Sequence, residues 1–178
     1  ELLDRDEGEA LSADGRAMLG RIRDSAGRMQ TLIDGLLDYA RLVNTPPNPA
    51  RIELRTIAEQ AASTHQPAID AAGGTVRIGD LPKAHGDPVL IERVFDNLIS
   101  NALKHHGQGA PHITIEGERL DDGFVRIAVA DDGPGVPADQ AEAIFQMLTQ
   151  LSTETGGLGA GLALCKTIVE SHGGAIGL

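Results

Sequence analysis

A run of apolar and small residues, spaced alternately three and four positions apart, constrains the first part of the chain most strongly. These residues are Leu19, Ile22, Ala26, Met29, Ile33, Leu36 and Ala40. The spacing is a heptad seam, typical of helices that pack against other helices. Ser12 or Asp14 can cap the start of such a helix, and Pro46 and Pro47 cannot continue it. The pattern therefore predicts one helix of about 30 residues.

A long helix with a single apolar stripe cannot bury that stripe by itself. Leu2 and Leu3 precede a turn-like segment at residues 6–9 and look like the end of an antiparallel partner helix. We therefore expect residues 1–46 to be part of a helical hairpin that forms a homodimer. Most of the partner helix is expected to lie outside this sequence.

After the proline-rich segment, short alternating pieces indicate helices layered on a sheet. Strands are predicted at residues 52–54, 75–78, 113–118 and 125–130 and from Ala175. Helices are predicted at residues 56–72, 88–106, 138–148 and 159–171. Asp87 and Pro88 suit the start of the second of these helices, and Asp121-Asp122-Gly123 suits a hairpin turn. Residues 51–178 are thus expected to form a second domain.

Composition excludes several classes of function. The formal net charge is -11, with 26 acidic against 15 basic residues, which disfavours a nucleic-acid partner. No apolar run approaches the roughly 20 residues of a membrane span, so we expect no membrane contact by this segment. Cys165 is the only cysteine, which excludes an internal disulfide and suits a reducing, cytoplasmic compartment.

The helix predicted after Pro88 carries polar side chains on one face. Asn97, Asn101, Lys104 and His105 follow the offsets i, i+4, i+7 and i+8. Carboxamide oxygens can ligate Mg²⁺ and a cation can pair with phosphate, whereas the alternative is an ordinary solvated helix face. The opposite side is expected to turn Val94, Leu98 and Ala102 toward the core.

A second polar element, at residues 131–136, follows a predicted strand. Asp131 at a strand end can accept a hydrogen bond from an exocyclic amine. Gly133 and Gly135, followed by Val136, let the backbone approach a flat ligand closely. An ordinary turn is the alternative, because Asp and Gly also form turns.

A third element is rich in glycine and leads directly into a predicted helix. Gly157, Gly159 and Gly161 precede Leu162 and the following helical pattern. Glycines at a helix start leave backbone N–H groups free to meet an anion at the positive end of the helix dipole. The element is not a P-loop, since no Lys-Ser/Thr pair follows the glycines. A flexible hinge is the alternative.

The order and separation of these elements resemble those of sensor histidine kinases, within the gyrase, Hsp90, histidine kinase and MutL ATPase superfamily. Residues 97–105 look like the N box, residues 131–136 the G1 box and residues 157–162 the G2 box. Residues 144–151 are similar to the F box. Residues 28–42 resemble the second helix of the dimerisation and phosphotransfer domain, which favours kinases over the other branches.

The resemblance implies ATP and Mg²⁺ as cofactors and a role for each matching residue. Asn101 would ligate Mg²⁺ with Asn97 beside it, and Lys104 and His105 would face the phosphates, with Lys104 as the catalytic cation. Asp131 would accept the adenine amine, and the G1 box would admit the ring at Gly133, Gly135 and Val136. The G2 box would wrap the triphosphate with Gly157, Gly159, Gly161 and Leu162, from a lid at residues 149–158.

The sequence departs from the family pattern in three places. Leu148 stands where the F box usually has a second Phe. The phosphoacceptor His is expected upstream of Glu1, and none of the six histidines lies on the predicted dimerisation helix. The usual final strand is expected to be incomplete, so residues 51–178 would be a catalytic ATP-binding domain truncated at its C-terminal end.

The expected fold is α+β, with a long dimerising helix followed by a two-layer α/β sandwich that has a mixed sheet and helices on one face, the Bergerat-type ATP-binding fold. The implied function is the kinase module of a two-component sensor histidine kinase. The γ-phosphoryl group of ATP would pass to a His on the hairpin and then to an Asp of a response regulator receiver domain. The alternatives are a non-catalytic dimerisation and docking module, or a serine kinase of the anti-sigma-factor type.

Overall fold

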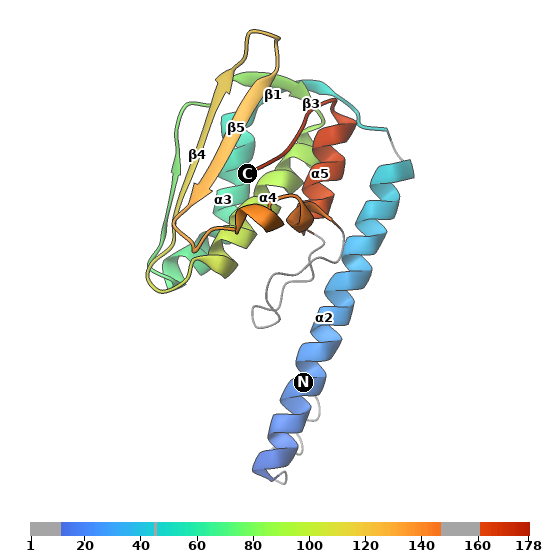
Figure 1. Cartoon of the computed structure of the whole chain (residues 1–178), viewed down its shortest axis with the longest axis vertical. Helices are drawn as coiled ribbons and strands as arrows, with labels where there is room; N and C mark the ends of the chain where they lie inside the picture. Colours follow the sequence, from blue (N-terminus) through green and yellow to red (C-terminus); the bar gives the residue numbers. More distant parts are fainter. Residues whose placement is uncertain (1–11, 45, 147–160) are drawn as a thin grey trace.

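The computed structural model describes residues 12–44, 46–146 and 161–178 (Figure 1). Helix α2 (Ala13–Asn44) is one helix of 32 residues, which confirms the long helix predicted from the heptad seam. The Ser12 hydroxyl accepts a hydrogen bond from the N–H of Gly15 at 3.1 Å and therefore caps the helix start. The helix ends ahead of the predicted breakers, Pro46 and Pro47.

Short strands in the described residues form two sheets. β1 (Ala50–Glu53) pairs antiparallel with β3 (Lys83–Gly86). In the larger sheet, β2 (Thr75–Ile78) runs parallel to β4 (His112–Arg119), and β4 forms the predicted hairpin with β5 (Val125–Asp131). The larger sheet is therefore mixed, as the sequence predicts.

Two helices cover one face of the mixed sheet, α3 (Leu54–Ala71) and α4 (Pro88–His105) (Figure 1). The core between these layers contains Ile57, Ala58, Ala61, Phe95, Ile99, Ala102, Ile113 and Ile115. Full burial of each large aliphatic or aromatic side chain contributes about 1.5–3 kcal/mol to stability. The helix α5 (Gly161–Ser171) packs beside α4, and α2 lies against α5.

The predicted helix at residues 138–148 is wrong. The described part of this segment contains two separate 3₁₀ turns, η1 (Ala138–Gln140) and η2 (Ala143–Phe145). Only Ile144 and Phe145 are buried in these turns. A helix this short needs a continuous apolar stripe to offset its nucleation cost, and two adjacent buried residues do not provide one.

The predicted strand from Ala175 is also wrong, because residues 174–178 form no ladder with any described strand. A strand is stable only when its N–H and C=O groups are paired. Conversely, β3 was not predicted. Its residues lack an apolar alternation, and it forms because its backbone pairs with β1, from Ala50 opposite Gly86 to Glu53 opposite Lys83.

The core-facing side of α4 differs in part from the prediction. Ala102 is buried as expected, but the deepest side chains are Phe95 and Ile99, whereas Val94 and Leu98 are only half-buried. The Val94 carbonyl accepts a contact from the Cys165 Sγ at 3.9 Å, so this side of α4 faces α5. The helix is packed on two sides, by the sheet and by α5.

Within the described residues, no helix combines the length and the apolar character that crossing a bilayer requires.

The fold predicts an inert thiol at Cys165. The side chain is fully buried, and burial raises the pKa of the thiol to about 12. Because the thiolate is the nucleophile, we expect iodoacetamide at pH 8 to modify the folded protein more than about 100-fold more slowly than the chain unfolded in urea. Mass spectrometry over time measures both rates, and equal rates would show that Cys165 is accessible in the native state.

Candidate functional site

The polar face of α4 predicted from the sequence is present in the structure. Asn97 and Asn101 are half-buried, and Lys104 and His105 are exposed in the last turn. The Asn97 Nδ2 donates to the carbonyl of Arg93 at 2.8 Å, which fixes the orientation of its side chain. Among the described residues, Asn101 makes no side-chain hydrogen bond. Its carboxamide therefore has capacity for a ligand.

The start of α5 lies against Asn97. A Cβ added at Gly161 would stand 2.6 Å from the Asn97 Oδ1, closer than real Cβ atoms approach an oxygen. A larger residue here would have to displace the Asn97 side chain, which is held by its bond to Arg93. The described part of α5 starts at Gly161, so the N-terminal part of this helix, on the positive side of its dipole, lies next to Asn97. Leu162 follows as a half-buried residue of α5.

The turn after β5 lies against the other end of the same face. The N–H of Gly133 donates to the Asp131 Oδ1 at 2.8 Å, so the carboxylate is held by its own turn and its second oxygen is left outside that bond. A Cβ at Gly133 would stand 2.6 Å from the Asp131 Oδ1 and 2.8 Å from the His105 carbonyl oxygen. Gly135 has a positive φ of 72°, which favours glycine, and Val136 is half-buried.

These two close approaches bracket the polar face of α4. Gly161 meets the helix at Asn97, and Gly133 meets it at His105. The two positions are eight helical steps apart, about 12 Å along the axis. Asn101 and Lys104 lie between them. The structure therefore brings together three segments that are far apart in the sequence.

Some predicted site residues lie outside the described residues. These are Gly157, Gly159, the lid at residues 149–158 and Leu148. Of the segment resembling the F box, Ile144 and Phe145 are described and buried, and their turn packs against α5.

Sequence reasoning did not assign a role to Asp132. Its Oδ1 accepts a hydrogen bond from the N–H of His112 at 3.0 Å. This bond from His112 lowers the pKa of Asp132 below its ordinary value. It also ties the turn after β5 to the start of β4 and so helps to orient Asp131. An Asp beside another Asp after a strand gives no sequence signal for such a partner.

The donor set of the bracketed face fits Mg²⁺ in one specific way. Among the described residues, no group of three or more His, Cys, Asp or Glu side chains could hold a metal by itself. Magnesium often has only one or two protein ligands and completes its octahedron with water and substrate phosphates. The carboxamide of Asn101, with Lys104 one turn away, matches such a partial site.

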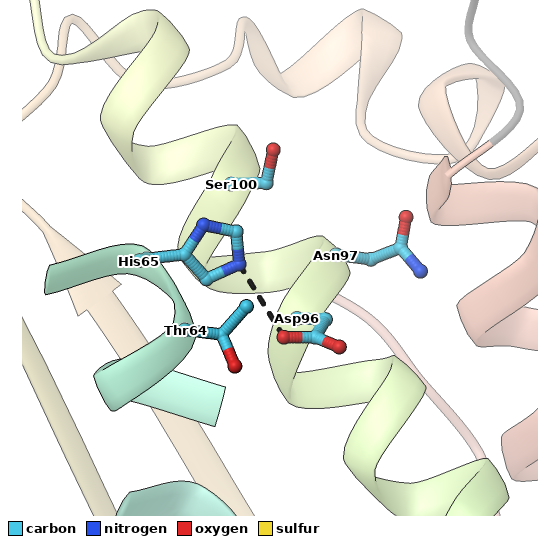
Figure 2. A pocket seen from close by; sticks show the side chains of 5 residues that line it. All are labelled: Thr64, His65, Asp96, Asn97 and Ser100. Atoms are coloured by element: carbon cyan, nitrogen blue, oxygen red, sulfur yellow. Dashed lines mark ion pairs between the residues drawn. The ribbon is translucent and has the colours of Figure 1, made fainter. Parts of the chain in front are cut away.

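A separate cleft lies between α3 and α4, with a volume of about 290 Å³ (Figure 2). It is lined by Thr64, His65, Asp96, Asn97 and Ser100. The Nε2 of His65 lies 3.4 Å from the Asp96 Oδ1. Figure 2 shows that the Asn97 carboxamide points away from His65. Because Asn101, Lys104 and Asp131 do not line it, we do not assign the cleft to the bracketed face.

Residues 86–178, more than half of the chain, match the histidine kinase-, DNA gyrase B- and HSP90-like ATPase family. The chain belongs to this family. The match begins at the end of β3 and includes α4, the turn after β5 and α5. The three segments that the geometry brings together thus all lie inside the family domain, and α2 lies outside it.

Curated relatives are similar over nearly the whole chain. The phytochrome-like protein Cph1 of Synechocystis sp. is 33% identical over 180 residues, covering 100% of this chain and 24% of that protein. The alginate biosynthesis sensor protein KinB of Pseudomonas aeruginosa is 35% identical over 164 residues, covering 89% and 27%. The chain spans about a quarter of the length of these relatives.

Solved structures show the same fold. ShkA, in a full-length structure in complex with AMPPNP, has a TM-score of 0.73 and 28% identity, covering 99% of this chain and 37% of that one. The catalytic domain of the histidine kinase ThkA has a TM-score of 0.60 at 23% identity, covering 69% and 80%. The expected α+β fold with a mixed sheet is confirmed.

The bracketing glycines give a prediction about stability. In Gly133→Ala the new methyl group meets the backbone carbonyl of His105, which cannot rotate away as a side chain could. We expect the free energy of unfolding, measured by urea titration, to fall by about 1–3 kcal/mol. Gly177→Ala is the matched control, because a Cβ there has no atom within 4 Å. Equal stability of the two variants would contradict the close packing of the turn on α4.

Proposed function

We propose that this chain is the ATP-binding kinase module of a two-component sensor histidine kinase. ATP with Mg²⁺ binds along the polar face of α4, and the γ-phosphoryl passes to a His on the dimerisation hairpin and then to an Asp of a response regulator receiver domain. The observation that carries the proposal is the bracketing of this face by Gly161 and Gly133. The similarity to sensor proteins over α2 as well as the family domain supports the kinase branch.

In this proposal the two ends of the nucleotide lie at the two ends of the bracketed face. Asp131 lies at one end and accepts the adenine amine, with Gly133, Gly135 and Val136 along the ring. At the other end lie Gly161 and Leu162 in the N-terminal part of α5, which suits phosphate, and Gly157 and Gly159 would extend this contact. The His105 carbonyl lies against Gly133, at the same end as Asp131, and its exposed side chain is proposed to turn toward the phosphates.

Catalysis in this proposal is mainly positioning and neutralisation of charge. Asn101, with Asn97 beside it, would hold Mg²⁺, which supplies charge compensation to the phosphates when bound. Lys104 places a cation on the same face and acts on the transferring phosphoryl group. The acceptor imidazole is a sufficient nucleophile at neutral pH without a dedicated base.

The division of the chain follows the same proposal. Residues 1–46 belong to the dimerisation and phosphotransfer hairpin, and residues 51–178 to the catalytic domain. Large apolar side chains on α2 are exposed, namely Met18, Ile22, Met29, Ile33 and Leu37. Such a stripe suits a four-helix bundle built from the hairpins of two copies. We place this segment in the cytoplasm, where response regulators are available to it.

The proposed nucleotide site is tested by removing two of its polar side chains. In Asn101→Ala and Asp131→Ala each lost side chain faces the ligand and not the core, so the fold should persist. We expect each variant to bind Mg·ATP about 10–100-fold more weakly in titration calorimetry, as for the loss of a hydrogen bond to a charged group or metal. Asp121→Ala, in the exposed hairpin turn, is the matched control and should bind like the parent. Unchanged affinity of both site variants, with binding in the parent, would remove the assigned roles.

A further inference from the structure

The start of α4 is connected to the segment that follows α2 by one carboxylate. The Asp87 Oδ1 accepts hydrogen bonds from the N–H groups of Val89 and Leu90, at 3.0 and 3.3 Å, and so caps α4. The Asp87 Oδ2 accepts a third bond, from the N–H of Asn48 at 2.8 Å. Asn48 lies 39 residues earlier in the sequence, between α2 and β1. Asp87 therefore bridges the interdomain linker and the helix that carries the nucleotide face.

The ring of His172 connects the end of α5 to the same point. Its Nε2 lies 2.9 Å from the N–H of Asp87, and its Nδ1 lies 2.8 Å from the carbonyl of Ile168. A backbone N–H can only donate and a carbonyl can only accept. Nε2 is therefore the acceptor and Nδ1 carries the hydrogen, so the pattern requires one tautomer of the neutral ring.

The His172 ring also lies close to the backbone of β3. Gly86, the last residue of β3, is buried and lies opposite Ala50 in the β1–β3 ladder. A Cβ at Gly86 would stand 3.3 Å from the His172 Cδ2 and 3.5 Å from the Ile52 Cδ1. The ring is thus packed on the small sheet while it bonds to Asp87. The linker, β3, α4 and α5 all meet here, and we call Asn48, Asp87 and His172 the joint.

The Asp87 carboxylate stays ionised over the physiological pH range. Burial raises the pKa of Asp87, but the hydrogen bonds from the N–H groups of Asn48, Leu90 and Val89 outweigh it and hold the pKa below its ordinary value of 3.8. Because the pKa of Asp87 is lower in the folded than in the unfolded chain, the ionised carboxylate adds to the stability of the fold above pH 3.8. This added stability is lost as the pH falls through the lowered pKa. At neutral pH the carboxylate is ionised and all three N–H bonds to it are charge-assisted.

The joint is placed where a shift of the linker would be transmitted to both sides of the nucleotide site. Asn97 lies about 15 Å along α4 from the capping residue Asp87, within one continuous helix. α5 runs back from His172 to Gly161, which touches Asn97. The two helices thus contact each other at both ends, and Asn48 of the linker is bonded to the end that carries Asp87 and His172.

We propose that Asp87 and His172 are positioning residues that couple the linker after α2 to the nucleotide-binding helices α4 and α5 during phosphoryl transfer. The proposal rests on the proposed function. The joint does not contact the nucleotide. It sets the angle at which the domain presents the γ-phosphate to the acceptor helix, so its loss should lower the rate of transfer and leave ATP affinity intact.

Asn48 offers a substitution that removes the N–H bonded to Asp87. Asn48→Pro deletes the N–H that Asp87 accepts, and the position lies between Pro47 and Pro49, where the backbone already favours the extended conformation that proline requires. Asn48→Ala is the matched control, because it keeps the N–H. Asp87→Ser is a second variant, since serine retains the helix cap with one oxygen and cannot also reach the linker.

The test is self-phosphorylation of the full-length protein, measured as KM for ATP and kcat. We expect Asn48→Pro and Asp87→Ser to lower kcat about tenfold with KM within twofold of the parent, and Asn48→Ala to match the parent. His172→Leu should behave like Asn48→Pro, and His172→Gln, whose amide oxygen can accept from Asp87, should recover most of the rate.

Three outcomes would contradict the proposed coupling role of the joint. One is an unchanged kcat in Asn48→Pro and Asp87→Ser, and another is an equal loss in Asn48→Ala. The third is a parallel change of KM and kcat together with a lowered unfolding midpoint, which would show a purely structural role. A parent that binds no ATP would instead refute the proposed function and leave the geometry of the joint as it stands.

Discussion

The structure depends on the two-sided packing of α4. This helix must bury Phe95 and Ile99 against the mixed sheet and at the same time present Asn97, Asn101 and Lys104 on another face. The helical repeat of 3.6 residues separates the two sets. Because the buried side is packed at core density, the polar side has a fixed position. Everything assigned to nucleotide binding is arranged around this one rigid element.

The other two segments of the proposed site come close to α4 because each has a glycine at the point of contact. Gly133 lets the turn after β5 lie against the His105 carbonyl, where a Cβ would collide with backbone, and Gly161 lets α5 lie against the Asn97 side chain without displacing it. The cleft beside His65 shows the contrast. It is a cleft of about 290 Å³ lined by hydroxyls and the His65–Asp96 pair, and the Asn97 carboxamide at its edge points away from His65 (Figure 2). We therefore place the proposed nucleotide site where backbone segments approach α4 closely, and not in the cleft.

Periodic patterns made most of the fold predictable. The heptad seam gave α2, and the polar offsets from Asn97 to His105 gave the face of α4, because both follow from helix geometry alone. Non-local pairing was not predictable. The strand β3 exists only through its ladder with β1, and the bond from Asn48 to Asp87 joins residues 39 positions apart with no periodic signal. The shared polar face could be found from the sequence, whereas its fixation to the linker could not.

Transfer of labelled phosphate tests the central claim most directly. The purified chain is incubated with γ-labelled ATP, alone and with a full-length Asp131→Ala protein that keeps its acceptor His. All six histidines lie outside α2, so the account predicts no label on the chain itself and acid-labile label on the full-length acceptor. Nucleotide binding without any transfer would indicate a docking module, and acid-stable label would indicate a serine kinase. Stoichiometric acid-labile phosphate on the chain itself would contradict the placement of the acceptor.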